Sequence, residues 1–262
     1  MKIIDVHAHI FPQKISEKAV KSIGDFYEIP MTSNKGTSEA LIESGSKIGV
    51  SKYLVFSTAT KKEQVESINR FIISECRKHS EFMGLGTMFV EYDGFEKELD
   101  FLKESGIKGI KLHPDFQKFA FDDERLYPIF EYLAKKNMFV LTHSGDKRYH
   151  FSNPDKITRV AKLFPDLNII AAHFGGWSEW EAAAEAPKLD NVFYDTSSTL
   201  LLTEKEKVFK ILNKFDKSHF FFGTDFPMWG HEEEFAAFMD LKLPDKLCED
   251  ILYNNFAEFY GV

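Results

Sequence analysis

Residues 2–10 read Lys-Ile-Ile-Asp-Val-His-Ala-His-Ile, a short apolar run that ends in two histidines. Apolar residues interleaved with polar ones predict a buried β-strand whose inner face becomes polar at its carboxyl end. On a strand, His7 and His9 lie on one face about 7 Å apart, and Asp5 is expected to share that face. The two imidazoles could bind one metal ion, or they could form hydrogen bonds only.

Strand and helix patterns alternate along the rest of the chain. Further strands are predicted at residues 52–59, 82–89, 107–113, 138–144, 168–174, 192–196 and 219–224. Helices are predicted at residues 37–48, 61–79, 93–105, 123–136, 155–164, 178–186, 204–215, 231–240 and 245–260. Residues 11–36 have only a weak helical pattern and are predicted to form a long loop over the first strand; they include Pro12, Pro30, Ser33, Asn34 and Gly36.

Eight strands, each followed by a helical segment, predict an α/β fold of the (β/α)₈ TIM-barrel type. The 262 residues are close to the roughly 250 typical of this barrel, and no linker-like stretch divides them. We therefore expect a single domain over residues 1–262. An open, doubly wound sheet is the alternative, but it would normally carry a glycine-rich phosphate loop where this chain has His7-Ala-His9.

The composition limits the classes of function. Hydrophobic residues make up 44% of the chain and charged residues 28%, as in a globular protein, and the net charge of −8 provides no basic surface for nucleic acid. No apolar run approaches the roughly 20 residues of a membrane span, and the amino terminus lacks a signal-peptide pattern. Cys76 and Cys248 form no paired-cysteine motif. We expect a cytoplasmic protein that binds a small-molecule substrate without nucleic-acid or membrane partners, and a homo-oligomer stays open.

The predicted strand ends share an unusual chemistry. In a TIM barrel the active site lies at the carboxyl ends of the strands. Five of the predicted strands end in residues that can bind metals or transfer protons, namely His7, His9, Lys111, His113, His143, His173 and Asp225. Each residue alone has a structural explanation, such as a core histidine, a salt-bridged lysine or a turn-capping aspartate. Their common position favours convergence on one site.

These motifs resemble those of the amidohydrolase superfamily from the first strand to the last. Three stretches are most similar to the branch that includes aminocarboxymuconate-semialdehyde decarboxylase: Asp5-Val-His-Ala-His-Ile-Phe-Pro12, Ala172-His-Phe-Gly-Gly176 and Phe222-Gly-Thr-Asp-Phe-Pro227. The resemblance implies a divalent metal held by His7, His9, His143, His173 and Asp225. Imidazole and carboxylate ligands favour Zn²⁺.

The fourth strand leaves the number of metal ions open. Gly109-Ile-Lys-Leu-His-Pro-Asp115 is similar to the strand of urease whose lysine is carbamylated and bridges two metals. The similarity implies that Lys111 is the carbamylated lysine that bridges two metals and that His113 contacts the substrate carbonyl. The decarboxylase relatives lack such a lysine and hold one metal, with the histidine that corresponds to His173 as a catalytic group.

The resemblance implies a metal-dependent hydrolase that cleaves a C–N or C–O bond of a small amide, lactone or ester. A bound divalent ion lowers the pKa of water from about 15.7 toward about 7, and Asp225 would take the proton while His113 or a metal polarises the carbonyl. The alternative is a non-oxidative decarboxylase, a lyase, of a small aromatic or muconate-like acid, with His173 as the second acid/base. A barrel that has lost activity and serves as a binding protein is the third interpretation.

Residues a little beyond the strand ends are predicted to contact the substrate. Phe11, Arg148, Trp177 and Trp229 are assigned this role, and Phe116 and Lys147 lie at similar positions. Aromatic walls with one or two cations suit a small planar or carboxylated substrate.

Overall fold

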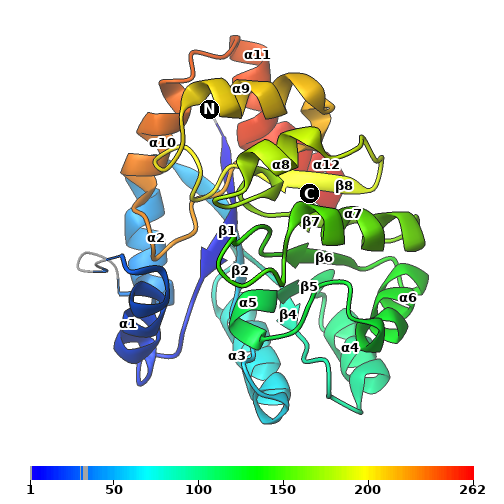
Figure 1. Ribbon diagram of the computed structural model, residues 1–262. Coiled ribbons are helices and arrows are strands. Elements are labelled where there is room, and N and C mark those ends of the chain that lie inside the picture. The colour runs from blue at the N-terminus through cyan, green and yellow to red at the C-terminus, as the bar shows by residue number, and fades with distance from the viewer. Residues whose placement is uncertain (1, 30, 32–34) are drawn as a thin grey trace.

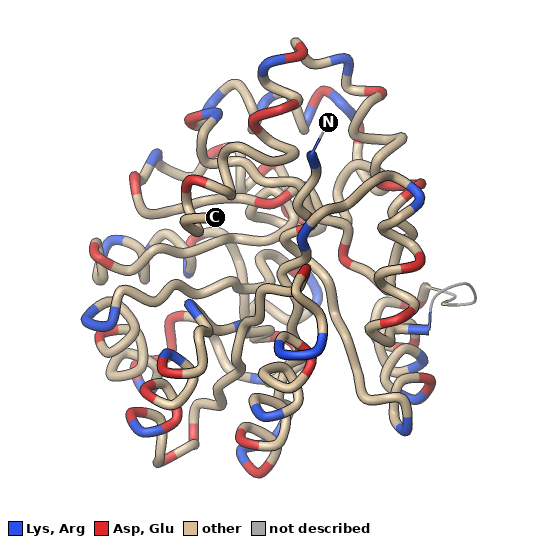
Figure 2. The backbone as a smooth tube through the Cα atoms, turned by 180° about the vertical axis from the view of Figure 1, so that it is seen from behind, with Lys and Arg blue, Asp and Glu red and all other residues tan. Residues whose placement is uncertain are grey.

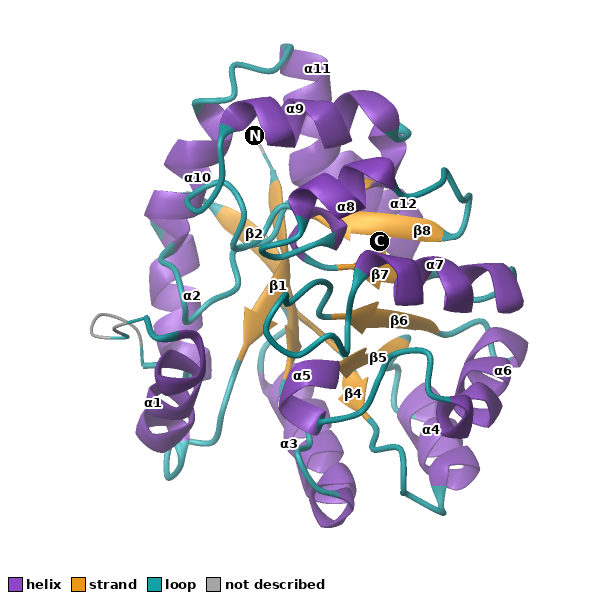
Figure 3. Cartoon of the chain, in the orientation of Figure 1, coloured by secondary structure: helices purple, strands orange, loops and turns teal. Residues whose placement is uncertain are grey.

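The computed structural model describes residues 2–29, 31 and 35–262. Strands lie at the centre of the molecule, and helices surround them (Figures 1 and 3). The strands are β1 (Ile3–His9), β2 (Val50–Phe56), β3 (Phe82–Gly84), β4 (Gly86–Thr87), β5 (Gly109–Leu112), β6 (Phe139–Thr142), β7 (Ile169–Ala171), β8 (Val192–Asp195) and β9 (Phe220–Phe221). Every ladder between these strands is parallel and joins strands that are consecutive in the chain.

The strands close into the predicted barrel. β3 and β4 together form the third barrel strand, which is interrupted at Leu85. The last strand meets the first through backbone hydrogen bonds, in which Val6 N donates to Phe222 O at 2.9 Å and Asp225 N donates to His7 O at 2.8 Å. Because all the strands are parallel, their carboxyl ends meet at one end of the barrel.

Most helices follow the predicted strand-helix alternation. The helices are α1 (Ser16–Tyr27), α2 (Ser38–Ser46), α3 (Val65–Lys78), α4 (Phe95–Glu104), α5 (Pro114–Gln117), α6 (Tyr127–Lys135), α7 (Pro154–Leu163), α8 (Trp180–Glu185), α9 (Lys205–Lys214), α10 (His231–Met239), α11 (Asp245–Glu249) and α12 (Asn255–Tyr260). Their ends carry the expected signals. The Thr37 side chain caps α2 by accepting a hydrogen bond from Ala40 N, and Pro154 occupies the first turn of α7.

The prediction of a long loop over residues 11–36 is wrong, because residues 16–27 form α1. Val20, Ile23, Gly24 and Tyr27 recur at helical spacing, and this face of α1 packs over the mouth of the barrel. Lysines and acidic residues lie between these positions, so the helical spacing of the apolar residues is weak in the sequence. Three residues named in that prediction, Pro30, Ser33 and Asn34, lie outside the described residues.

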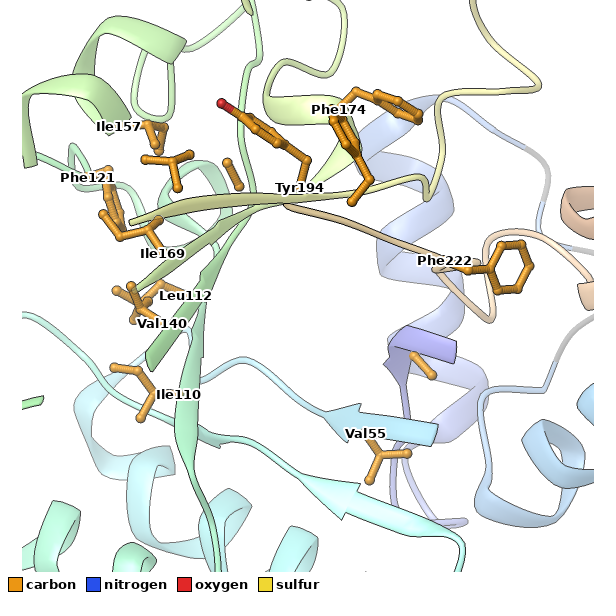
Figure 4. Close-up of a cluster of buried hydrophobic side chains, with 14 of the residues drawn as sticks. Val55, Ile110, Leu112, Phe121, Val140, Ile157, Ile169, Phe174, Tyr194 and Phe222 are labelled. Carbon is orange, nitrogen blue, oxygen red and sulfur yellow. The ribbon is translucent and has the colours of Figure 1, made fainter. Parts of the chain in front are cut away.

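Two apolar clusters pack on the two faces of the sheet. The outer cluster fills the space between strands and helices and includes Val55, Ile110 and Val140 (Figure 4). The inner cluster fills the barrel and comprises Ile4, Val6, Leu54, Phe56, Met83, Leu85, Phe139, Leu141, Ile170, Ala172 and Phe221, together with Phe256, Ala257 and Tyr260 of α12. Successive residues of one strand belong to different clusters, as the two-residue period of a strand requires. The barrel is therefore a packed core rather than a pore.

Strand β1 departs from this period just before its two histidines. Asp5 pairs with Tyr53 and Ala8 pairs with Val55, so β1 contains one residue more than β2 over this interval. An extra residue of this kind is a β-bulge, and it moves the side chains that follow to the opposite face. The bulge lies between the apolar start of β1 and its two histidines.

As a consequence, Asp5 does not share a face with His7 and His9, contrary to the sequence prediction. The carboxylate of Asp5 accepts hydrogen bonds from the backbone nitrogen of Thr224 at 3.0 Å and from its hydroxyl at 2.7 Å. Its Oδ2 lies 3.0 Å from Nε2 of His231 in α10. Asp5 therefore joins β1 to the segment after β9 and is not a ligand candidate.

Charged residues of both signs are interspersed along the outer helices (Figure 2). Typical pairs are Lys21 with Asp25 at 2.7 Å and Lys246 with Asp250 at 2.6 Å, and exposed pairs of this kind contribute about 0–1 kcal/mol each. Among the described residues, no helix combines the length and apolarity that membrane crossing requires. The cytoplasmic location and the expected partners stay predictions.

Candidate active site

The carboxyl ends of the strands surround a cavity. Its lining includes all seven residues that the sequence predicts as ligands or proton-transfer groups: His7, His9, Lys111, His113, His143, His173 and Asp225. All seven are buried. Ile23, Tyr27, Phe116 and Met228 complete the lining. The closure of a parallel barrel thus brings together residues that are up to 218 positions apart in the sequence.

His7, His9 and Asp225 form the first of two groups in this cavity. Oδ1 of Asp225 lies 3.4 Å from Nε2 of His7 and 3.3 Å from Nε2 of His9. Burial alone would raise the pKa of Asp225, but interactions with His7, His9 and His173 outweigh it and hold that pKa well below its usual range. Asp225 is therefore an anion that faces two imidazole nitrogens.

Asp195, at the end of β8, accepts hydrogen bonds from one residue of each group. Nδ1 of His7 donates a hydrogen bond of 2.8 Å to Oδ2 of Asp195, and the backbone nitrogen of His173 donates to Oδ1 at 3.0 Å. Burial and the charge of Lys111 lower the pKa of His7 well below its usual value, so its imidazole is neutral. Because a carboxylate only accepts, the single proton of His7 lies on Nδ1. Nε2 of His7 is then free to bind a metal.

His143 and His173 form the second group. Nδ1 of His143 lies 3.0 Å from Nε2 of His173. On their far sides, Nε2 of His143 donates to the carbonyl of Gly145 at 2.8 Å, and Nδ1 of His173 donates to the carbonyl of Ser197 at 3.0 Å. Burial lowers the pKa of both histidines, which leaves them neutral. The unprotonated nitrogens therefore face the cavity. Metal-binding histidines typically have this arrangement, in which the other ring nitrogen donates a hydrogen bond to a protein oxygen.

The donor set fits a divalent metal ion. His7, His173 and Asp225 each offer one atom, and these atoms lie within 4.8 Å of one another. His9 and His143 adjoin this set through the contacts described above. Neutral imidazoles with one carboxylate suit zinc and other divalent first-row metals. The residues present could thus hold the metal that the sequence predicts.

Lys111 lies beside the first group. Its side chain is fully buried, with Nζ 3.2 Å from Nε2 of His7 and 4.9 Å from the ring centre of Phe56. Among the described residues, no carboxylate lies within ion-pair distance of this nitrogen. Burial lowers the pKa of Lys111 to about 8. At pH 7 roughly a tenth of Lys111 is therefore an uncharged amine, far more than of a lysine with its ordinary pKa.

Tyr27 is a cavity residue that the sequence analysis missed. Nδ1 of His113 accepts a hydrogen bond from Phe116 N at 3.3 Å, so the proton of this neutral imidazole lies on Nε2. Nε2 of His113 then donates to the Tyr27 hydroxyl at 2.8 Å. Burial raises the pKa of Tyr27 well above its usual value, so the phenol keeps its proton. The sequence does not single out Tyr27, because its pattern predicts a loop over residues 11–36.

The guanidinium group of Arg148 has hydrogen-bond partners within the protein. Its Nε and Nη2 donate to the two carboxylate oxygens of Asp146 at 3.0 Å and 2.8 Å, and Nη1 donates to the carbonyl of Phe26 at 2.8 Å. The rings of Tyr27 and Trp177 lie 5.5 Å and 5.3 Å from its Cζ. Arg148 therefore ties the end of α1 to the loop after β6.

Of the aromatic residues predicted near the substrate, Phe116 lines the cavity, whereas Phe11, Trp177 and Trp229 surround it. Phe11 stacks on His9 with ring centres 6.4 Å apart, and Trp177 packs edge-on against Tyr27 at 5.0 Å. Nε1 of Trp229 donates to Oγ of Ser198 at 2.8 Å. The cavity lining contains none of Phe11, Arg148, Trp177 and Trp229, whose substrate contacts stay predictions.

The segment after β8 supplies support that the sequence analysis did not assign. Asp195, Ser197 and Ser198 hydrogen-bond to His7, His173 and Asp225 respectively. The signal was present as Asp195-Thr-Ser-Ser-Thr199, a run of polar residues at the end of a buried strand. A polar run at the catalytic end of a barrel strand indicates a site even without a histidine.

Three site residues at these strand ends have a strained backbone. His173, Ser198 and Asp225 have φ values of 60°, 47° and 60°, in the left-handed region that favours glycine. Such a conformation costs on the order of 1–3 kcal/mol per residue and persists only where the surroundings enforce it. Strain at three site residues is typical of a functional site.

A comparison with protein families decides the class. The family model described as Amidohydrolase matches residues 4–262. The chain belongs to the amidohydrolase family. This membership confirms the resemblance drawn from the sequence motifs, and it implies a divalent metal. A comparison with curated proteins gives no match.

Solved structures similar to this amidohydrolase confirm the TIM-barrel class. An uncharacterized TIM-barrel protein from Bordetella bronchiseptica is 18% identical with a TM-score of 0.80, and the alignment covers 100% of this chain and 99% of that chain. A protein from Pseudomonas putida described as a 2-pyrone-4,6-dicarboxylic acid hydrolase is 15% identical, with a TM-score of 0.71 and coverages of 99% and 97%. A dihydroxybenzoic acid decarboxylase from a Polaromonas species, solved with manganese and 2-nitroresorcinol, is 12% identical, with a TM-score of 0.74 and coverages of 99% and 97%. At these identities the similarity shows the fold, which hydrolases and decarboxylases share.

Proposed function

We propose that this amidohydrolase is a metal-dependent hydrolase that cleaves the C–N or C–O bond of a small amide, lactone or ester. The observation that carries the proposal is the buried Lys111, which lies 3.2 Å from His7 Nε2 and has no carboxylate partner among the described residues. An isolated buried ammonium is costly, and a cation does not bind a metal. An uncharged Lys111 amine can instead attack carbon dioxide and lose a proton, which gives a carbamate.

The carbamate would reverse the charge at Lys111. Its two oxygens would offer one ligand to each of two ions. His7, His9, His143, His173 and Asp225 all border the cavity and would supply the remaining ligands. Zinc is the proposed metal because it accepts imidazole and oxygen ligands at open catalytic sites.

The residues around the cavity have distinct proposed roles. A bound divalent ion lowers the pKa of water to about 7 and polarises a carbonyl. Asp225, which is ionised, accepts the proton of the attacking water and returns it to the leaving nitrogen or oxygen. His113 carries its proton on Nε2, which donates to the Tyr27 hydroxyl in this structure. The substrate oxygen, where negative charge develops, would replace that hydroxyl as the acceptor.

The walls of the cavity support a small substrate. Ile23, Tyr27, Phe116 and Met228 contribute largely apolar surface opposite the polar strand ends. A planar carbonyl compound with few charged groups suits such walls.

A second candidate function is non-oxidative decarboxylation of a small aromatic or muconate-like acid. The observation that favours it is the grouping of His7, His173 and Asp225 around a single point, with mutual distances within 4.8 Å. One ion held near this point by His7, His9, His143 and Asp225 leaves Lys111 as an amine and leaves His173 beside the ion without being needed to hold it. His173 would then transfer the proton that replaces the released carboxyl group.

Metal stoichiometry tests the proposal. Wild type purified without chelator should hold about two divalent ions per chain, and Lys111→Ala should hold one or none and lose activity. A short carboxylic acid with bicarbonate should partly restore the variant. The control is Lys97→Ala on the exposed side of α4, which should keep both ions.

The same measurements identify the alternatives. An unchanged metal content in Lys111→Ala rules out the bridged site and favours the decarboxylase, for which His173→Ala should abolish activity without loss of metal. Release of carbon dioxide without consumption of water would establish the second function directly. Metal content near zero in wild type, with no activity after zinc, manganese or iron is added, contradicts both.

A further inference from the structure

The two carboxylate oxygens of Asp225 have different surroundings. Oδ1 faces Nε2 of His7 and Nε2 of His9 at 3.4 Å and 3.3 Å. Oδ2 accepts a hydrogen bond of 2.6 Å from Oγ of Ser198, which belongs to the loop after β8. The hydrogen bond therefore engages the oxygen that does not face the imidazoles.

The direction of this hydrogen bond is fixed by a neighbour. The indole Nε1 of Trp229 can only donate, and it donates to Oγ of Ser198 at 2.8 Å. The ionised carboxylate of Asp225 can only accept. The Ser198 hydroxyl, which has a single hydrogen, therefore accepts from Trp229 and donates to Asp225. Sδ of Met228 lies 3.4 Å from the same Oγ and is a weak acceptor.

The backbone around this chain of hydrogen bonds is held in an unfavourable conformation. Ser198 has φ of 47° and Asp225 has φ of 60°, and both side chains are buried. A serine in the left-handed region costs free energy that a glycine would not. The contact between the two side chains depends on both backbone positions.

We propose that Ser198 and Trp229 are positioning residues that keep Oδ2 of Asp225 away from the metal, so that Asp225 binds through Oδ1 alone. The inference rests on the proposed metal centre. A carboxylate that is free to turn can bind a metal through both oxygens, and the second oxygen would take the position that water needs. A hydrogen-bonded Oδ2 leaves that position open.

Glycine at position 198 isolates the contribution of the hydroxyl. Ser198→Gly removes Oγ and is compatible with a φ of 47°, so the backbone itself is not strained further. Trp229→Phe keeps an aromatic ring and removes only the N–H donor. Ser178→Gly is the matched control, because Ser178 has φ of 61° and its Oγ accepts from Lys147 N rather than contacting Asp225.

Cobalt(II) is the probe, because its visible absorption weakens as its coordination number rises. Each protein is stripped of metal and loaded with Co²⁺, and the bound cobalt is counted by elemental analysis. Ser198→Gly should bind as much Co²⁺ as wild type but absorb about twofold less per bound ion. Trp229→Phe should change the spectrum in the same direction by a smaller amount, and Ser178→Gly should match wild type.

Each outcome decides the inference. A fully loaded Ser198→Gly with the wild-type spectrum overturns it while the metal centre stands. If Ser198→Gly does not fold, Trp229→Phe decides, and a spectrum identical to that of wild type overturns the inference. Wild type that binds no Co²⁺ overturns the proposed metal centre and this inference with it, a result that the cobalt count separates from the others.

Discussion

The two ends of the barrel interior use the same strands for opposite purposes. At the amino end, Leu54, Phe139 and Phe221 belong to the inner cluster, which α12 closes. At the carboxyl end, the same interior contains Lys111 and Asp225. Hydrocarbon burial stabilises the first end by roughly 25 cal/mol per Å² of apolar surface, whereas the burial of charged groups at the second end costs free energy.

The polar end contains further groups that are costly to bury. Burial raises the pKa of Asp115 to about 7 and raises the pKa of Glu234 well above its usual value. Both oxygens of Glu234 lack a hydrogen-bond partner among the described residues. The amino end of the barrel interior therefore stabilises the fold, whereas the carboxyl end holds reactive groups at the expense of stability.

The largest expected effect is on activity at the polar end. Asp225→Asn removes the proposed proton acceptor and should lower kcat by about 10⁴-fold, while the free energy of unfolding stays within about 1 kcal/mol of wild type. Both are measured on one preparation, with the best substrate from a screen of esters, lactones and amides. The exposed Glu232→Gln is the control for a loss of negative charge. A variant that unfolds rather than loses activity would contradict the division between the two ends.

The next effect is on stability at the apolar end. Phe221 is fully buried and lies 5.2 Å from Phe256 and 5.3 Å from Phe259, between ring centres. Phe221→Ala should reduce the free energy of unfolding by about 3–5 kcal/mol, because it leaves a cavity, while the metal content of folded protein is unchanged. Urea denaturation and elemental analysis measure the two quantities. The half-buried Phe259→Ala should cost less, and loss of metal in Phe221→Ala would show that the ends are coupled.

A smaller effect of opposite sign is expected at Lys111. Lys111→Met replaces a buried amine with an apolar chain of similar length, so metal-free protein should become more stable by about 1–3 kcal/mol. The measurement is urea denaturation in the presence of chelator. The exposed Lys97→Met should leave stability unchanged within about 0.5 kcal/mol. Destabilisation by Lys111→Met would mean that the amine contributes to the fold through its contacts with His7 and Phe56.

The smallest effect concerns pH. Burial holds the pKa of His113 well below its ordinary 6.5, so the unfolded chain binds a proton that the folded chain does not. Stability from this group is fully present above pH 6.5 and is lost as the pH falls below it, by about 1.4 kcal/mol per pH unit. His113→Asn keeps an acceptor for Phe116 N and should reduce the fall between pH 6.5 and 5.5 by about that amount in metal-free protein.

The exposed His150→Asn is the control for the pH experiment, since His150 also has a positive φ of 57° that asparagine tolerates. It should leave the dependence of stability on pH as in wild type. An unchanged dependence in His113→Asn would contradict the burial of a neutral imidazole at position 113.

The sequence predicts most of the barrel and all seven strand-end residues of the cavity. His143 and His173 illustrate the reason, because each directly follows an apolar run that only a buried strand explains. Parallel strands then bring their ends together whatever the details of packing. The prediction failed for α1, whose apolar face is narrow and acquires its partner only when the barrel mouth forms.

Local pattern alone thus determined the fold class, the family motifs and which strands contribute to the site. The tertiary structure decided which way the side chains point. The bulge in β1 separates Asp5 from His7, and it exists only in the pairing of β1 with β2. The hydrogen bond from Ser198 to Asp225 joins positions 27 residues apart through two unfavourable backbone conformations. Contacts of this kind depend on register and on long-range packing, which no short stretch of sequence contains.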